Sequence, residues 1–196
     1  KFACEGCGVC EFLCPVGAIT LNPSKAGELR LYSDSGKVFS TAQLKMGSGT
    51  SGMLVTKVKK QITTATNVGE IAIIDGSPGI GCPVIASISN VNLILIVTEP
   101  SLSGISDMER VIKTAETFQT RVVVCVNKYD VNVENTEEIE RFCLEREIEF
   151  VGKIPYDADA VKAINAGLTI VDVDCLSGNA VKMIFERVMK IFLEKV

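Results

Sequence analysis

The chain has 196 residues, of which 47% are hydrophobic and 22% are charged, and its formal net charge is −4. This length predicts one domain of ordinary size or one domain with a small module attached. The acidic balance, without any block of lysine and arginine, argues against a nucleic-acid-binding surface. The sequence has no apolar run of about eighteen residues to span a membrane and no signal peptide, so the expected location is the cytoplasm.

The chain contains eight cysteines. In a reducing compartment, cysteines are typical of metal sites, redox sites or packed core thiols rather than disulfides. The chain begins with Lys1 instead of methionine, and its cysteine run starts at the fourth residue. We therefore expect these residues to be the remainder of a longer protein.

The first motif is the run "CEGCGVCEFLCP", with four cysteines spaced by two, two and three residues before a proline: Cys4, Cys7, Cys10 and Cys14. This spacing matches the C-x2-C-x2-C-x3-C-P pattern of bacterial ferredoxins, in which the fourth cysteine ligates the other of two 4Fe-4S clusters. Gly6 and Gly8 would let the backbone fold tightly around a cluster. A zinc site usually pairs two distant C-x2-C knuckles, and the other alternative is four reduced thiols in a loop. As it stands, the chain carries three ligands for one cluster and one for another.

Two elements are expected after the cysteine module. Residues 28–44 alternate polar and apolar side chains around the turn signal "SDSG" and predict a β-hairpin. Residues 49–65 carry apolar side chains near helical spacing and predict a helix.

From Glu70 onward, short apolar runs alternate with amphipathic segments. Strands are expected at 70–75, 91–99, 121–128 and 149–155, and helices at 84–90, 105–119, 135–147, 157–167 and 177–195, the last capped by Ser177. Fully apolar strands between helices indicate an α/β fold, in which a parallel sheet carries helices on both faces. Ligands of such sheets bind beyond the carboxyl ends of the strands. This rule directs attention to 98–100, 127–128 and 155–157, besides Asp75.

Asp75 ends the first of these strands and is followed by Pro78 and Gly79. A carboxylate at this position can hold the water shell of Mg²⁺, and a glycine after it lets a backbone N–H approach a terminal phosphate. The alternative is that Asp75 caps the following helix.

Asn127, Lys128 and Asp130 follow the third strand in the sequence "VVVCVNKYD". An amide at this position can hydrogen-bond the exocyclic amine of adenine. The pattern N-K-x-D also resembles the guanine-reading motif of GTPases, and a plain polar strand end is the third alternative.

The order of these motifs carries a resemblance that covers nearly all of the chain. The segments "DGSPGIGCPVIAS", "VTEPSLSGISDMERV", "VVVCVNKYD" and "VGKIPYD" resemble the MinD-type, deviant-Walker ATPases. With "CEGCGVCEFLCPVGAI" in front, the chain resembles the members of the MinD and nitrogenase-iron-protein superfamily that carry an inserted ferredoxin domain. The resemblance implies an incomplete P-loop NTPase-like fold, with a partial 4Fe-4S module at 1–27 and an ATPase domain at 28–196 that lacks the Walker A segment.

The resemblance also implies a role for individual residues. Asp75 would be the switch II aspartate at Mg²⁺ and Gly79 the phosphate-sensing glycine. Asn127 would contact adenine, and Pro155 would begin the loop on the adenine side. Lys128 and Asp157, at the same strand ends, are further candidates for cofactor binding. The implied cofactors are a 4Fe-4S cluster, ATP and Mg²⁺.

The phosphate-binding loop K-G-G-x-G-K-[ST] of this family is absent from the chain. The nearest match is "GSGTSGML", in which Met53 and Leu54 stand where a lysine and a hydroxyl residue are needed. The segment instead resembles the start of the helix that follows the insert in the family. We therefore expect ATP hydrolysis from the full-length protein and none from this chain alone.

Four cysteines lie outside the run. Cys125 and Cys143 occupy apolar faces and are expected to be core thiols, and Cys175 precedes the last helix and is expected to be inert. Cys82 lies just past the Asp75 loop, where the nitrogenase iron protein has a cluster-binding cysteine at a similar offset. It is either a metal ligand or a small residue that packs at a helix start.

Together these features predict an ATP-dependent switch protein coupled to an iron–sulfur cluster, which acts in electron transfer or metallocluster maturation. The expected partners are a second copy of the chain when nucleotide is bound and a redox or metalloenzyme client. The alternatives are an iron–sulfur electron carrier or scaffold without catalysis, and a GTPase.

Overall fold

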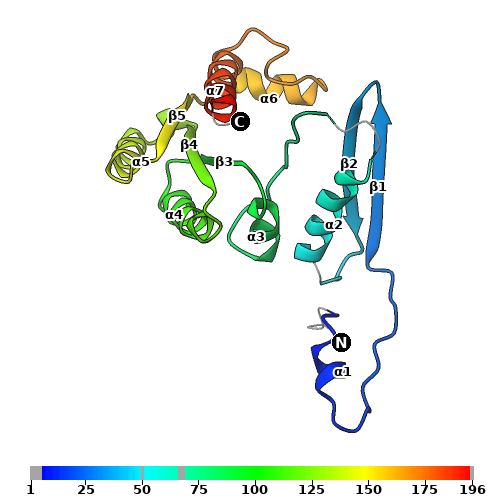
Figure 1. Ribbon diagram of the computed structural model, residues 1–196. Coiled ribbons are helices and arrows are strands. Elements are labelled where there is room, and N and C mark those ends of the chain that lie inside the picture. The colour runs from blue at the N-terminus through cyan, green and yellow to red at the C-terminus, as the bar shows by residue number, and fades with distance from the viewer. Residues whose placement is uncertain (1–5, 50, 66–68, 195–196) are drawn as a thin grey trace. The chain divides into compact units, whose positions relative to one another are not determined.

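The computed structural model describes residues 6–49, 51–65 and 69–194 (Figure 1). The chain divides into two compact units, Lys1–Ile88 and Ser89–Val196. The predicted boundary after residue 27, between the cysteine module and the ATPase domain, does not coincide with this division and stays a prediction.

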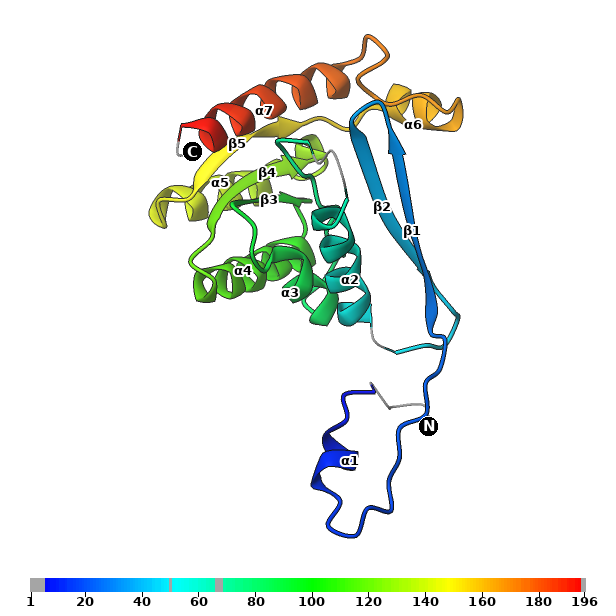
Figure 2. The same ribbon diagram turned by 45° about the vertical axis from the view of Figure 1, so that its right-hand side comes forward.

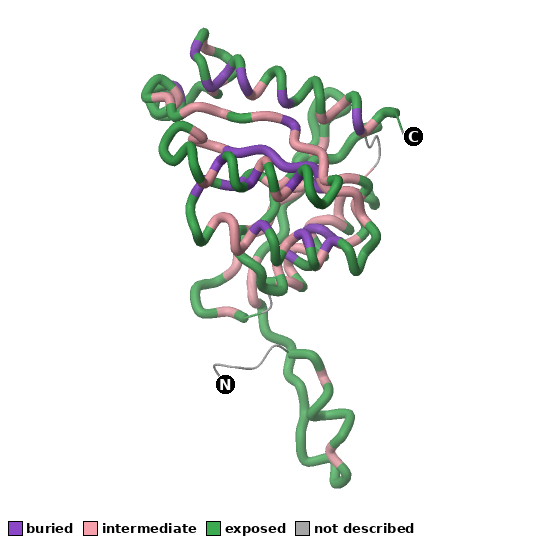
Figure 3. The backbone as a smooth tube through the Cα atoms, turned by 90° about the vertical axis from the view of Figure 1, so that its left-hand side faces the viewer, coloured by how far each residue is buried: buried purple, intermediate pink, exposed green. Residues whose placement is uncertain are grey.

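The described part of the cysteine module, from residue 6, holds one short helix, α1 (Val9–Leu13), and is otherwise irregular. Its side chains are largely exposed, as the green lower segment in Figure 3 shows. Gly8 precedes α1 with φ of 80°, a left-handed conformation that glycine adopts without a Cβ penalty. Among the described residues of this module, 6–27, none is buried in a hydrophobic core.

The predicted hairpin is confirmed. Strands β1 (Gly27–Asp34) and β2 (Lys37–Leu44) pair antiparallel. Ser35 and Gly36 make the two-residue turn with positive φ values of 48° and 81°. Positive φ at both central positions is typical of the type I′ turn, whose twist matches that of the two strands.

Two helices complete the N-terminal unit. The predicted helix α2 (Ser51–Thr63) lies along the hairpin, and the hydroxyl of Ser40 donates to the carbonyl of Val58 at 2.9 Å. The Lys59 ammonium donates to the carbonyls of Ala86 and Ser87 in α3 (Cys82–Ile88). Because the last carbonyls of a helix lack partners within the helix, this lysine stabilises the end of α3.

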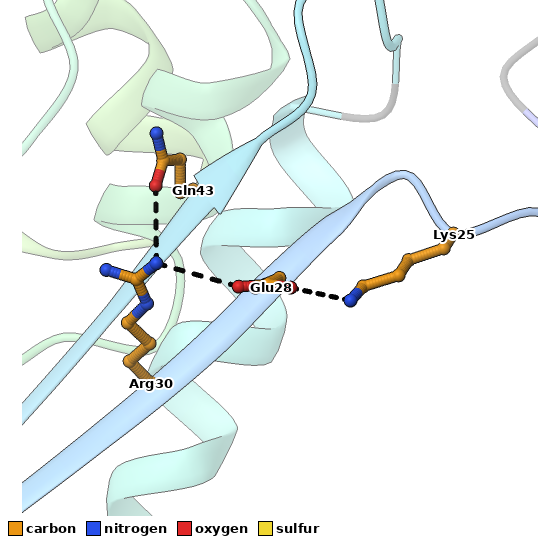
Figure 4. A network of polar contacts seen from close by, with 4 residues as sticks. All are labelled: Lys25, Glu28, Arg30 and Gln43. Carbon is orange, nitrogen blue, oxygen red and sulfur yellow. Dashed lines mark hydrogen bonds and ion pairs between the residues drawn. The ribbon is translucent and has the colours of Figure 1, made fainter.

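The hairpin face turned away from α2 carries polar and aromatic side chains. Glu28 accepts from Lys25 at 2.6 Å and lies 3.6 Å from Arg30, which reaches Gln43 at 3.5 Å (Figure 4). Lys25 is the main cause of the lowered pKa of Glu28. Since these side chains are exposed, the network adds little to stability.

The strand predicted at 70–75 is not formed, and that prediction is wrong. Residues 71–77 have no regular secondary structure, and Ile73 is 84% exposed. An apolar run becomes a strand only when a neighbouring strand pairs with its backbone groups. Within the described residues no strand pairs with this run.

The C-terminal unit is a three-stranded parallel sheet in the order β3 (Leu93–Thr98), β4 (Arg121–Asn127), β5 (Glu149–Ile154). The strands alternate with helices α4 (Leu102–Thr117), α5 (Val133–Glu145), α6 (Ala158–Asn165) and α7 (Leu176–Leu193), and a 3₁₀ turn η1 (Tyr129–Val131) follows β4. Figure 2 shows α7 on one side of the sheet and α4 on the other. The predicted α/β architecture is confirmed.

Each face of the sheet has its own hydrophobic core. Val124 and Val126 of β4 point to α4 and α5, where Met108 and Ile139 are buried. The alternate residues of β4 point to α7 on the other face, where Ile184 and Ile191 are buried. Because side chains alternate along a strand, helices on both sides require a strand that is apolar at every position.

Cys125 and Cys143 are core thiols as predicted, but the predicted cap of α7 is wrong. Cys125 and Cys143 are buried in the two cores, and burial raises the pKa of each thiol to about 11. The expected cap of α7, Ser177, is wrong, because Cys175 is the N-cap residue and its Sγ accepts the N–H of Gly178 at 3.3 Å. Sulfur is a weak acceptor, so the sequence pattern favoured the hydroxyl of Ser177.

The two cores make a stability prediction. Replacing Met108, 1% exposed in α4, with alanine should lower the free energy of unfolding by about 2–5 kcal/mol, because the substitution leaves a cavity. Met183→Ala is the matched control, since Met183 is 65% exposed on α7 and should change that free energy by less than about 0.5 kcal/mol. Urea unfolding measures both, and equal losses would contradict the assignment of the core.

Candidate functional site

The carboxyl ends of β3, β4 and β5 lie at the same edge of the C-terminal sheet because the strands are parallel. Four of the predicted site residues lie at this edge, at the end of β4 or in the segments that follow β4 and β5: Asn127, Lys128, Pro155 and Asp157. Asp75 and Gly79 belong to the N-terminal unit. The structure thus brings the predicted base-side residues to one edge.

Lys128 joins the loops after β3 and β4. Its ammonium donates to the Glu99 carboxylate at 2.7 Å, and this contact is the main cause of its raised pKa. Lys128 has φ of 54°, a left-handed conformation that is uncommon for a residue with a side chain. This turn directs the chain from β4 into η1.

Two further side chains of the segment after β4 reach the loops beside it, and sequence reasoning did not identify these contacts. The Asn135 amide donates to the carbonyl of Pro100 at 3.0 Å. The Asp130 carboxylate accepts the backbone N–H of Tyr156 at 2.7 Å. The segment after β4 therefore holds the loops after both of its neighbours.

Asn127 is half-buried at the last position of β4, in register with Ile154. Among the residues that the structure describes, none makes a hydrogen bond with its side-chain amide. The amide keeps both a donor and an acceptor for a ligand at this edge.

Asp157 has partners within the protein. Its carboxylate accepts the N–H of Asp159 at 2.9 Å and that of Ser177 at 3.0 Å, so it caps α6 and also holds the start of α7. The Ser177 N–H is the main cause of its lowered pKa. A cofactor contact would have to use the remaining lone pairs, and the predicted role of Asp157 in binding stays a prediction.

Asp75 and Gly79 lie in the irregular segment that leads into α3. Asp75 is exposed, and within the described parts of the chain no hydrogen bond to its carboxylate is found. Gly79 has φ of 85°, and a Cβ built on it would meet no atom within 4 Å. The backbone around Gly79 is thus open to a ligand.

The cysteine run is only partly described, because Cys4 lies outside the described residues. Cys7 and Cys10 are exposed, and the Sγ of Cys14 accepts the N–H of Ala18 at 3.2 Å. Backbone N–H groups, that of Val16 first, lower the pKa of Cys14. This donor set suits an iron–sulfur cluster, which thiolates hold. In the described residues alone, no three acidic or thiol groups lie close enough together to hold a metal ion.

Cys82 and the segment "GSGTSGML" contact each other. A Cβ built on Gly52 would lie 3.0 Å from the Cβ of Cys82, so Cys82 packs closely on α2. Helix α2 begins at Ser51, within the glycine segment. Met53 stands in the first turn of α2, where a phosphate-binding loop would have its lysine.

Comparison with known families identifies the N-terminal module. Residues 2–20, which include the whole cysteine run, match the 4Fe-4S binding domain Fer4. This match supports a 4Fe-4S cluster over the zinc and free-thiol alternatives.

Two curated proteins of Methanocaldococcus jannaschii resemble the chain. The uncharacterized protein MJ0578 is 29% identical over 145 residues, which are 74% of this chain and 48% of that protein. The uncharacterized protein MJ0579 is 26% identical over 164 residues, 84% of this chain and 55% of that protein. The chain therefore spans about half the length of the curated relatives it matches.

Among solved structures, the MinD cell division protein of Aquifex aeolicus resembles the chain with a TM-score of 0.56 and 24% identity, over 71% of this chain and 61% of that one. The MinC:MinD complex of the same organism gives the same TM-score and identity over 71% of this chain and 59% of that one. The chain thus has a MinD-like α/β fold with a 4Fe-4S binding domain at its N-terminus. Across the described ranges, every helix is too short or too polar to cross a membrane.

The cluster assignment predicts the effect of serine substitutions. After anaerobic reconstitution with iron and sulfide, Cys7→Ser and Cys10→Ser should each lose most of the broad charge-transfer absorbance, because hydroxyls replace thiolate ligands. Cys82→Ser is the control and should keep the iron content. Stoichiometric zinc without iron, or an equal loss in Cys82→Ser, would contradict the assignment.

The contacts of Asp157 predict a pH dependence. Its pKa is lowered from 3.8 in the folded state, so its contribution to stability is present above that value and is lost as the pH falls through the lower, folded-state pKa. Asp157→Ala should therefore destabilise the protein at pH 7, and the difference from wild type should shrink below about pH 4. Thermal unfolding across this range, with the exposed Glu138→Ala as control, measures it. A difference independent of pH would show that the carboxylate contacts are not the cause.

Proposed function

We propose that this protein is an ATP-dependent switch coupled to a 4Fe-4S cluster. The observation that carries the proposal is the presence of a 4Fe-4S binding domain and a MinD-like fold in one chain. When bound, the cluster would supply one-electron redox chemistry. Cys4, Cys7 and Cys10 would be thiolate ligands of this cluster, and Cys14 would be a ligand of a second cluster.

The loops after β4 and β5 would bind the base. Asn127 offers a half-buried amide without a partner among the described residues, which suits the exocyclic amine and ring nitrogen of adenine. Pro155 begins the neighbouring loop. Lys128 and Asp157 would act mainly by fixing these loops, since Glu99 and Ser177 already engage them.

The segment before α3 would bind the phosphate side. Asp75 would hold the water shell of Mg²⁺, and the open backbone at Gly79 would approach the terminal phosphate. A glycine-rich loop with a lysine is still needed to cradle a triphosphate, and residues 28–196 do not encode one. The free edge of β3, which pairs only with β4 in the described sheet, would accept a strand that carries such a loop.

In this proposal a nucleotide-bound homodimer acts in the cytoplasm on a redox or metalloenzyme client. The second candidate is an iron–sulfur electron carrier or scaffold without catalysis. The absence of a phosphate-binding loop from the sequence favours that candidate for these residues on their own.

The proposal is tested with Asp75→Asn in the full-length protein. Mg²⁺-dependent ATP hydrolysis should fall on the order of a hundredfold, because the amide holds the metal's water shell less well, while ATP affinity should change little. Asp107→Asn, on α4 where its side chain is 49% exposed, is the matched control. Equal losses of affinity and hydrolysis in Asp75→Asn, or the absence of ATP binding by the wild type, would overturn the proposal.

A further inference from the structure

Asp130 holds the loop after β5 by a backbone contact. Its Oδ1 accepts the N–H of Tyr156 at 2.7 Å, across 26 residues of sequence. Tyr156 follows Pro155, at the start of the proposed base-side loop. The carboxylate thus sets the position of this loop relative to the end of β4, where Asn127 lies.

The main chain around Asp130 is itself fixed. Lys128 turns in the left-handed conformation, and the hydroxyl of Thr136 donates to the carbonyls of Tyr129 and Asn132 at 2.9 Å each. Thr136 is buried, and Tyr129 packs against the core on that face of the sheet. Asp130 therefore projects from a well-anchored turn. Its contact with Tyr156 fixes the loop after β5 relative to that turn.

Guanine recognition would require the same carboxylate. Guanine presents two adjacent N–H donors on its Watson–Crick edge, which a carboxylate accepts with both oxygens. In this protein Oδ1 already accepts the N–H of Tyr156, so a contact through both oxygens would have to share that atom with the loop. Adenine presents a donor beside an acceptor, which matches the amide of Asn127 instead.

We propose that Asp130 is a positioning residue that holds the base-side loop and does not read the base, so that the site selects adenine over guanine. This inference rests on the proposed nucleotide site. It separates Asp130 from the guanine-reading role that its N-K-x-D sequence suggests.

The first arm of the test needs no nucleotide. In Asp130→Ala, the Tyr156 amide should exchange with solvent roughly tenfold faster, because its acceptor is lost. Asp130→Asn keeps an oxygen at the same position and should exchange nearly as slowly as wild type. Glu137→Ala, an exposed change on α5, is the control. Unchanged exchange in Asp130→Ala would overturn the contact.

The second arm measures affinity of the full-length protein for ATP and GTP with Mg²⁺. We expect ATP to bind at least tenfold more tightly than GTP, Asp130→Asn to keep this ratio, and Asp130→Ala to weaken ATP roughly tenfold. A wild type that binds GTP more tightly than ATP and loses this preference in Asp130→Asn would show that Asp130 reads guanine. Unchanged ATP affinity in Asp130→Ala would show that the contact with Tyr156 does not contribute to nucleotide binding, and would overturn the positioning role. If wild type binds neither nucleotide, the proposed function fails and the base-selecting role with it, while amide exchange still decides whether the loop contact exists.

Discussion

The buried central strand β4 is the constraint on which the C-terminal unit depends. It pairs with β3 on one edge and β5 on the other, and Val123 to Val126 have almost no solvent exposure. Its side chains supply both hydrophobic cores, so the helices on both faces depend on it. Because β4 is paired on both edges and packed on both faces, its carboxyl end is fixed. The segment that begins at Lys128 therefore starts from a defined position.

That fixed end organises the candidate site. Three side chains from one eight-residue segment reach the loops after β3 and β5: Lys128, Asp130 and Asn135. Each contact is partly exposed and adds little stability alone. Together they fix the positions of the three loops after β3, β4 and β5. Asn127 therefore lies beside loops that are already ordered before a ligand binds. Preorganisation of this kind lowers the cost of ordering loops when a ligand binds.

The sequence predicted elements whose signals are local and failed where the outcome depends on a partner. The hairpin followed from a turn at Ser35 and Gly36 that needs positive φ, and the buried strands from uninterrupted apolar runs. The prediction of a strand at 70–75 was wrong because the composition of a segment does not show whether a neighbouring strand pairs with it. The prediction of Ser177 as the cap of α7 was wrong because N-cap preferences favour oxygen acceptors, and the thiol of Cys175 takes that position instead. The contact between Asp130 and Tyr156 spans 26 residues, and no local pattern indicates it.

We propose that nucleotide binding changes the properties of the cluster. The most direct test therefore measures the cluster with and without bound nucleotide. The electron paramagnetic resonance spectrum of the reduced cluster should be recorded in the reconstituted full-length protein, with and without saturating MgATP. We predict that nucleotide binding changes the spectrum or the potential at which the cluster is reduced, and that Asp75→Asn weakens this response. An identical spectrum and potential in protein that has bound ATP would contradict the coupling.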